Sequence, residues 1–186
     1  MKRLGNDECW CGSHQKYKKC HQKFDERLRY LKRQGYVIPQ HKMIKNEKQI
    51  EGIKQAAVIN SGLLDYIESH IGAGMTTQEI DDMTVEYLKA HDASSADLHY
   101  EGYPKSICTS INDVVCHGIP DAQVVLKEGD IINVDATSCY KGYYAGASRM
   151  FMIGDVSEEA RQLVEVTREC LYKGIESIRP FKSTIS

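Results

Sequence analysis

The sequence predicts an α+β fold, in which helices cover one face of an antiparallel sheet and a small cysteine-rich segment precedes this body. Three observations lead to the prediction. Apolar residues recur at helical spacing over 46–91. Two β-forming runs are joined by a turn at Lys141-Gly142. Three of the seven cysteines fall within residues 9–20. Helices followed by paired strands are typical of the α+β class.

Two helices open the body, and each begins at a recognisable cap. Asn46 is followed three residues later by Gln49, and Thr76 is followed in the same way by Glu79. Such pairs cap a helix N-terminus, because each side chain satisfies a backbone N–H that has no partner within the helix. Gly72 predicts the end of the first helix.

The strands follow the two helices. Residues 106–118 and 130–139 are rich in β-forming side chains, and residues 143–153 return along the second run as a hairpin. The turn is predicted to include Lys141-Gly142 and to be centred near 140–141. A third helix is expected from Ser157 to Pro180, with a buried apolar stripe. That stripe consists of Leu163, Val164, Leu171, Ile175 and Ile178.

Composition excludes several classes of protein. The chain has 186 residues, of which 41% are hydrophobic and 27% charged, so it is neither disordered nor collagen-like. No apolar run approaches the roughly 20 residues that a membrane-spanning helix needs. The first residues, MKRLGNDECW, lack the apolar region of a signal peptide. We therefore expect a cytoplasmic protein with reduced thiols and no membrane contact.

Charge is distributed unevenly along the chain. Residues 1–50 hold 13 Lys and Arg against 5 Asp and Glu, a balance of +8, while the remainder holds 11 against 21, a balance of −10. A basic arm on an acidic body indicates two parts with different partners. A solvated arm without a partner remains an alternative.

The cysteines near the N-terminus have the spacing of a metal site. Cys9 and Cys11 are joined by an eight-residue loop to Cys20 and His21. Zinc favours four such ligands in a tetrahedron, and a closed Cys3His set makes a structural site. Incidental reduced cysteines are the alternative. The predicted organisation is a zinc-binding segment at 1–23, a basic linker with a short helix at 24–45, and the body at 46–186.

The segment resembles the SEC-C motif, C-x-C-x8-C-H, in all four ligand positions. That family's module docks on protein or ribosome partners, so the resemblance implies ribosome binding through the arm. Lysines around the site suit an acidic or phosphate-bearing partner. Trp10 and Tyr17 are expected to form a hydrophobic plug over the zinc, with partner contacts as the alternative.

Asp135 stands in the middle of an apolar strand, where a carboxylate is costly unless it is paired or binds a metal. An exposed strand edge is the other explanation. His117 ends another β-like run, and such a histidine is often only structural. The words around these residues are more informative: YEGYPKSICTSINDVVCHGIP over 100–120, GDIINVDATSCYKGYY over 129–144 and SRMFMIG over 148–154.

These stretches closely resemble type I methionine aminopeptidase, with the SEC-C motif ahead of it. The resemblance implies a pita-bread fold, here its N-terminal half, and removal of the initiator methionine from nascent polypeptides. It also implies two divalent metal ions (Co, Mn, Fe or Zn) that activate a bridging water. By motif position Asp135 is an active-site metal ligand and His117 a catalytic, substrate-contacting residue. Tyr100, Tyr103 and Cys108 match residues that line the methionine pocket of the family.

The chain departs from the family at one decisive position. The second metal aspartate lies eleven residues after the first, and here that position is Gly146. With a turn at 140–141, residues 135 and 146 are expected to be direct cross-strand neighbours, with Cβ atoms about 5 Å apart. The family's remaining ligands come from a second half, so the chain is expected to be truncated. An inactive aminopeptidase is the main hypothesis, and a non-catalytic, zinc-dependent ribosome or nascent-chain binding module is the alternative.

Overall fold

The computed structural model describes residues 4–179 and divides the chain into two compact units, Met1–Ile53 and Lys54–Ser186. The first unit contains η1 (Tyr17–Lys19), α1 (Gln22–Arg33) and η2 (His41–Met43). The short helix predicted in the basic segment is therefore confirmed as α1. The helix α2 (Glu47–Glu68) begins in the first unit and continues into the second.

Local capping starts the helices of the body as predicted. The Asn46 amide donates to Gln49 Oε1 at 3.0 Å, and the Gln49 amide donates to Asn46 Oδ1 at 2.9 Å. The helix α3 (Thr77–Ala90) begins with the corresponding exchange between Thr76 and Glu79. None of the described helices is both long and apolar enough to cross a membrane.

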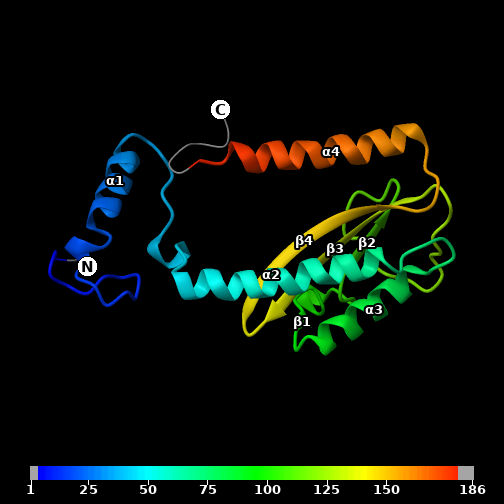
Figure 1. The fold of residues 1–186 in the computed structure, drawn as a ribbon, viewed down its shortest axis with the longest axis horizontal. Coiled ribbons are helices and arrows are strands. Elements are labelled where there is room, and N and C mark those ends of the chain that lie inside the picture. Colours follow the sequence, from blue (N-terminus) through cyan, green and yellow to red (C-terminus); the bar gives the residue numbers. More distant parts are fainter. Residues whose placement is uncertain (1–3, 180–186) are drawn as a thin grey trace. The chain divides into compact units, whose positions relative to one another are not determined.

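A four-stranded antiparallel sheet forms the rest of the body (Figure 1). Its strands are β1 (Ser94–Ser95), β2 (Cys108–Ile111), β3 (Ile131–Tyr140) and β4 (Tyr143–Met152). The central strand β3 pairs with β4 along one edge and with β1 and β2 along the other. A single-turn helix, η3 (Tyr100–Gly102), lies in the connection between β1 and β2.

Alternation along β3 gives the sheet one buried face and one half-buried face. Ile132, Val134 and Ala136 are buried with Leu63 and Ile67 of α2, so this face forms the core with α2 and α3. The intervening residues of β3, including Asp135, are half-buried on the opposite face. Because side chains alternate along a strand, the core fixes which residues share the face of Asp135.

The last helix, α4 (Glu158–Ser177), begins at its predicted cap, where Ser157 Oγ accepts from the Ala160 amide at 3.2 Å. The prediction that its apolar stripe is buried is wrong, because α4 has no buried residue. Leu163 and Leu171 are 60% and 61% exposed. Periodicity identifies an apolar face but does not provide the surface that covers it. The helix end predicted at Pro180 lies outside the described residues.

Candidate metal centre and active-site face

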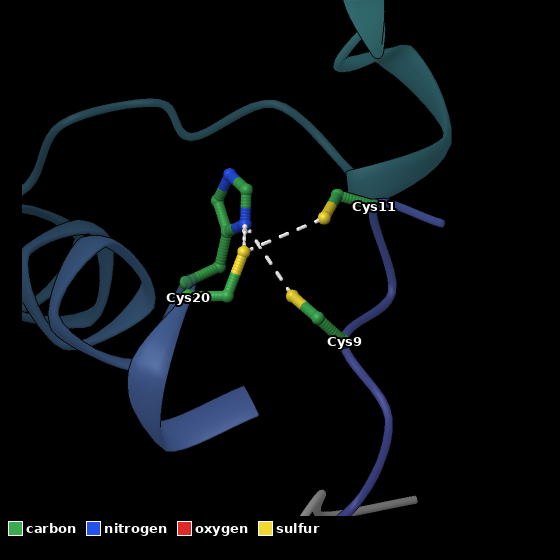
Figure 2. A group of neighbouring side chains, drawn as sticks. Cys9, Cys11 and Cys20 are labelled. Carbon is green, nitrogen blue, oxygen red and sulfur yellow. Dashed lines mark hydrogen bonds between the residues drawn. The ribbon is translucent and has the colours of Figure 1, made fainter. Parts of the chain in front are cut away.

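The four residues predicted as zinc ligands come together at one point of the first unit. The ligand atoms of Cys9, Cys11, Cys20 and His21 all lie within 4.8 Å of one another. Figure 2 shows the sulfur atoms of the three cysteines converging from two separate segments. His21 Nδ1 lies 3.0 Å from Cys20 Sγ and 3.3 Å from Cys9 Sγ. Among residues 4–179 no other group of three potential metal ligands is this compact.

This geometry fits a tetrahedral metal ion. Zn–S bonds of about 2.3 Å place two sulfur atoms of a tetrahedron roughly 3.8 Å apart. The observed distance between Cys11 Sγ and Cys20 Sγ is 3.6 Å. The Ser13 hydroxyl, 3.1 Å from Cys11 Sγ, lowers the pKa of the Cys11 thiol to about 6, whereas burial raises the pKa of Cys9. A thiolate is the form that binds metal.

Backbone pairing brings the two halves of the cluster together. The Cys9 amide donates to the Gln15 carbonyl at 2.8 Å, and the Tyr17 amide donates to the Asp7 carbonyl at 2.7 Å. Between them the chain reverses at Gly12, whose φ of +77° is readily adopted only by glycine. The two segments therefore run back along each other, with Cys9 and Cys11 on one and Cys20 at the end of the other.

Two residues that were not predicted, Asp25 and His41, complete this region. The Asp25 carboxylate is buried and accepts hydrogen bonds from Trp10 Nε1 at 3.1 Å and from the Tyr17 hydroxyl at 2.8 Å. Its other oxygen lies 3.1 Å from His41 Nε2. Burial and the Asp25 carboxylate raise the pKa of Tyr17 to about 12. Asp25 therefore joins Tyr17 to Trp10, whose ring lies 4.6 Å from the ring of His21.

The second candidate site lies on the half-buried face of the sheet. Asp135 on β3 is flanked by Cys108 of β2 on one side and by Ser148 of β4 on the other. The predicted pairing of residues 135 and 146 is wrong by two positions. Gly146 lies opposite Thr137, because the turn centres on Lys141 and Gly142 rather than on 140–141.

A side chain at position 146 would face a small space. A Cβ atom built there would lie 3.0 Å from Thr137 Oγ1, its nearest neighbour. The three nearest atoms all belong to the Thr137 side chain, and rotation about its χ1 would make room for an aspartate. Glycine at this position is therefore not required by backbone packing.

Two of the predicted pocket residues, Tyr103 and Cys108, lie near the loop that follows β2. Gly118 approaches β2 so closely that a Cβ atom there would be 2.0 Å from the Thr109 carbonyl oxygen, so only glycine fits. This contact holds the neighbouring His117, with φ of +56°, beside the strand. The Tyr103 hydroxyl donates to the Ile107 carbonyl at 2.9 Å and lies 3.2 Å from the Gly118 carbonyl.

Burial has electrostatic consequences at these residues. It is the main cause that raises the pKa of Tyr103 and the pKa of the Cys108 thiol, so both groups are neutral near pH 7. Tyr100 is different, because its side chain is 68% exposed. The structure therefore groups Tyr103 and Cys108 at the start of β2, while Tyr100 faces solvent.

Asp97 is a further residue that was not predicted. Its carboxylate accepts a hydrogen bond from the Thr137 amide at 2.9 Å, at the point where β3 is paired with neither β1 nor β2. Burial raises the pKa of Asp97, and the nearby Asp135 carboxylate raises it further. Asp97 lies two residues after β1, and no pattern in the sequence pointed to it.

The described residues on this face do not fit a pair of metal ions. Asp135 belongs to no group of three potential ligands among residues 4–179. Gly146 offers no ligand atom. The disagreement concerns this face alone, because the cysteine cluster of the first unit fits a metal ion.

The second unit is thus an antiparallel sheet backed by two helices, with the Asp135 carboxylate on the half-buried face of the sheet. Residues 51–186 match the model of metallopeptidase family M24, and residues 6–23 match the SEC-C motif. The chain belongs to metallopeptidase family M24. Within that family its relatives are methionine aminopeptidases.

Three relatives illustrate the match. Methionine aminopeptidase A of Synechocystis is 48% identical over 135 residues, which are 73% of this chain and 53% of that protein. The enzyme of Chlamydia trachomatis is 42% identical over 187 residues, 97% of this chain and 62% of that protein. The crystal structure of the Rickettsia prowazekii enzyme superposes with a TM-score of 0.72 at 42% identity, covering 74% of this chain and 55% of that one.

The likeness confirms the predicted family and the α+β, pita-bread type of fold. The chain spans between half and two thirds of the length of these relatives. The activity of the full-length relatives is therefore not established for this chain by the likeness alone.

Proposed function

We propose that the body of this chain is the part of a methionine aminopeptidase that recognises the N-terminal methionine of nascent polypeptides, and that this chain does not cleave the peptide bond. The family assignment supports the first statement, because the relatives that match over most of the chain are methionine aminopeptidases. Gly146 is the observation that carries the second.

Catalysis in a dinuclear site depends on carboxylates that hold both metal ions. The pair of ions lowers the pKa of a bound water and stabilises the tetrahedral intermediate. In our proposal Asp135 supplies one such carboxylate and Gly146 supplies none. A single carboxylate holds Co, Mn, Fe or Zn weakly, because these ions need several ligands in a defined geometry.

Substrate recognition is assigned to the residues around the start of β2. Cys108 lies directly beside Asp135 across the strands. The Tyr103 hydroxyl contacts the backbone carbonyls of Ile107, which precedes Cys108, and of Gly118. Neutral sulfur and phenol groups suit a thioether side chain. In this proposal Tyr103 and Cys108 line the methionine pocket with Tyr100, and His117 contacts the scissile peptide.

The direct test is release of methionine from Met-Ala peptides by the full chain, with Mn²⁺ or Co²⁺ added. We expect no release above a blank that contains the metal alone. The matched variant His117→Ala distinguishes specific turnover from contamination. Release above the blank that disappears in His117→Ala would overturn the proposal of an inactive site.

A second candidate function is favoured by the first unit. There the ligand atoms of a metal site are preassembled within a segment whose net charge is +8. We propose that this arm, with structural zinc bound, docks on the ribosome, which would place the protein in the cytoplasm. Phosphate backbones attract such clusters of lysine and arginine in a salt-dependent manner.

Ribosome co-sedimentation at moderate salt tests this second function. Cys20→Ser removes a ligand of the cluster, and Cys170→Ser is the matched control, because Cys170 is an exposed cysteine of α4. We expect binding to be lost in the first variant and retained in the second. Equal sedimentation of both variants would exclude the zinc arm as the docking element.

A further inference from the structure

We propose that Asp25 and His41 are positioning residues of the metal centre, although both lie outside the matched motif of residues 6–23. They fix the Trp10 indole against His21. The short segment that carries Cys9 and Cys11 is held in place with it. The same contacts tie the segment after α1 to the metal centre. The metal module then extends to His41, beyond the boundary expected at residue 23.

Asp25 is the centre of the arrangement. Its carboxylate is 9% exposed, and burying a charge is costly unless it is hydrogen-bonded. The Trp10 N–H and the Tyr17 hydroxyl donate to one of its oxygens, and His41 Nε2 contacts the other. These three partners come from the loop, from η1 and from η2. Asp25 therefore joins three separate segments of the first unit.

Trp10 transmits this arrangement to the metal ligands. It lies between Cys9 and Cys11 in the chain, so only a few backbone dihedrals separate its indole from two sulfur ligands. The ring stacks on His41 at a centroid distance of 4.5 Å and an interplanar angle of 11°. Its other neighbour is the ligand His21, at 4.6 Å. Fixing the indole therefore restricts both ends of the cluster.

His41 brings in the segment that follows α1. It lies 16 residues after Asp25 and is preceded by Ile38 and Pro39, which line the same cleft as Asp25, Tyr17 and Leu28. Metal binding and the docking of this segment then favour one another. A ligand that binds only the ordered form stabilises that form. Metal loading should therefore protect residues 34–45, which lead into α2.

Metal affinity of the full-length chain is the first test. Zinc or cobalt is titrated in competition with a chromophoric chelator. Partners behind metal ligands typically contribute about 10- to 100-fold to affinity, and we expect Asp25→Asn to lower it by about 10-fold. The matched control is Glu26→Gln, which removes the same charge from the adjacent, exposed position and should bind metal as the wild type does.

Limited trypsin digestion is the second test, because Arg33 directly precedes the segment and Lys42 and Lys45 lie within it. We expect zinc to protect these sites in the wild type, and a chelator or His41→Ala to expose them. His41→Gln retains a side-chain N–H donor and should restore part of the protection. The fluorescence of Trp10, the only tryptophan of the chain, should change in parallel.

The thermal unfolding transition of the body is the control for global unfolding. It should have the same midpoint in all variants. Wild-type metal affinity in Asp25→Asn, together with unchanged protection in His41→Ala, would overturn the proposal. The proposal rests on the cysteine cluster and the residues around it, and on no residue of the body. The outcome is therefore independent of whether the body cleaves methionine.

Discussion

Gly146 lies directly opposite Thr137 in the β3–β4 hairpin, while Asp135 lies opposite Ser148, two positions further from the turn. Residues 135 and 146 are thus diagonal neighbours on the same face of the sheet. Diagonal pairs are separated by about 7–8 Å, compared with about 5 Å for direct pairs. Carboxylates at that separation could flank two metal ions that lie about 4 Å apart. A spacing of eleven residues thus suits two carboxylates in a diagonal pair. In this chain Gly146 supplies no carboxylate to that pair.

Restoring the carboxylate should create metal-dependent stability. Gly146→Asp places a second negative charge near Asp135, which should lower the free energy of unfolding by up to about 1 kcal/mol without metal. Mn²⁺ or Co²⁺ should then raise the thermal midpoint of the variant, measured with the cysteine cluster saturated with zinc. Gly146→Asn is the uncharged control. An equal rise in the wild type would show that Asp135 binds metal without a second carboxylate.

Cysteine reactivity should follow the different pKa values in the metal cluster. In metal-free protein at pH 7, Cys11 should be alkylated by iodoacetamide before Cys9, because its pKa is about 6 and burial raises the pKa of Cys9. Mass spectrometry of tryptic peptides measures both rates. Ser13→Ala should slow the labelling of Cys11, and zinc should block it. Preferential labelling of Cys9 would contradict this account.

Asp97 should make stability depend on pH. Burial raises its pKa, so the folded state binds a proton more readily than the unfolded state does. The stabilisation linked to this group is therefore complete at pH values below the unfolded pKa and is lost as pH rises through the raised pKa. Urea unfolding between pH 4 and 7 should show that Asp97→Asn removes part of this decline. A constant difference between wild type and variant across the range would argue against the shift.

The bare apolar face of α4 should cause self-association. Leu163 and Leu171 are mostly exposed, and contiguous apolar patches promote association. Sedimentation velocity should show concentration-dependent association of the wild type, and Leu163→Lys with Leu171→Lys should reduce it. Tyr172→Lys is the control, because helical spacing places Tyr172 about 180° around α4 from Leu163 and about 100° from Leu171. A monomer with a sharp, reversible thermal transition would be the opposite result.

Features set by near neighbours in the chain could be predicted from the sequence. The caps at Asn46, Thr76 and Ser157 form as expected, because each depends on residues within one helical turn. The metal cluster could be predicted for a similar reason. Its two ligand pairs are joined by a single short loop, so their spacing in the sequence is enough to predict that they lie close together.

Features that depend on distant contacts could not be predicted in the same way. The hairpin register differs by two positions from the predicted one because the turn is centred between Lys141 and Gly142, both with positive φ, rather than near 140–141. In the sequence Asp25 resembles any charged residue of a basic helix, because its partner His41 lies 16 residues away. The stripe of α4 was identified correctly as apolar. Its exposure depends on which surface meets it, which periodicity alone does not specify.

The central claim is that Gly146 makes this chain inactive, and one measurement tests it most directly. Residues 51–186 replace the matching part of the Rickettsia prowazekii methionine aminopeptidase, and methionine release from a Met-Ala peptide is followed with Mn²⁺ or Co²⁺. We predict that the chimaera carrying Gly146 is inactive and that Gly146→Asp restores turnover. Activity of the Gly146 chimaera equal to that of Gly146→Asp would contradict the account.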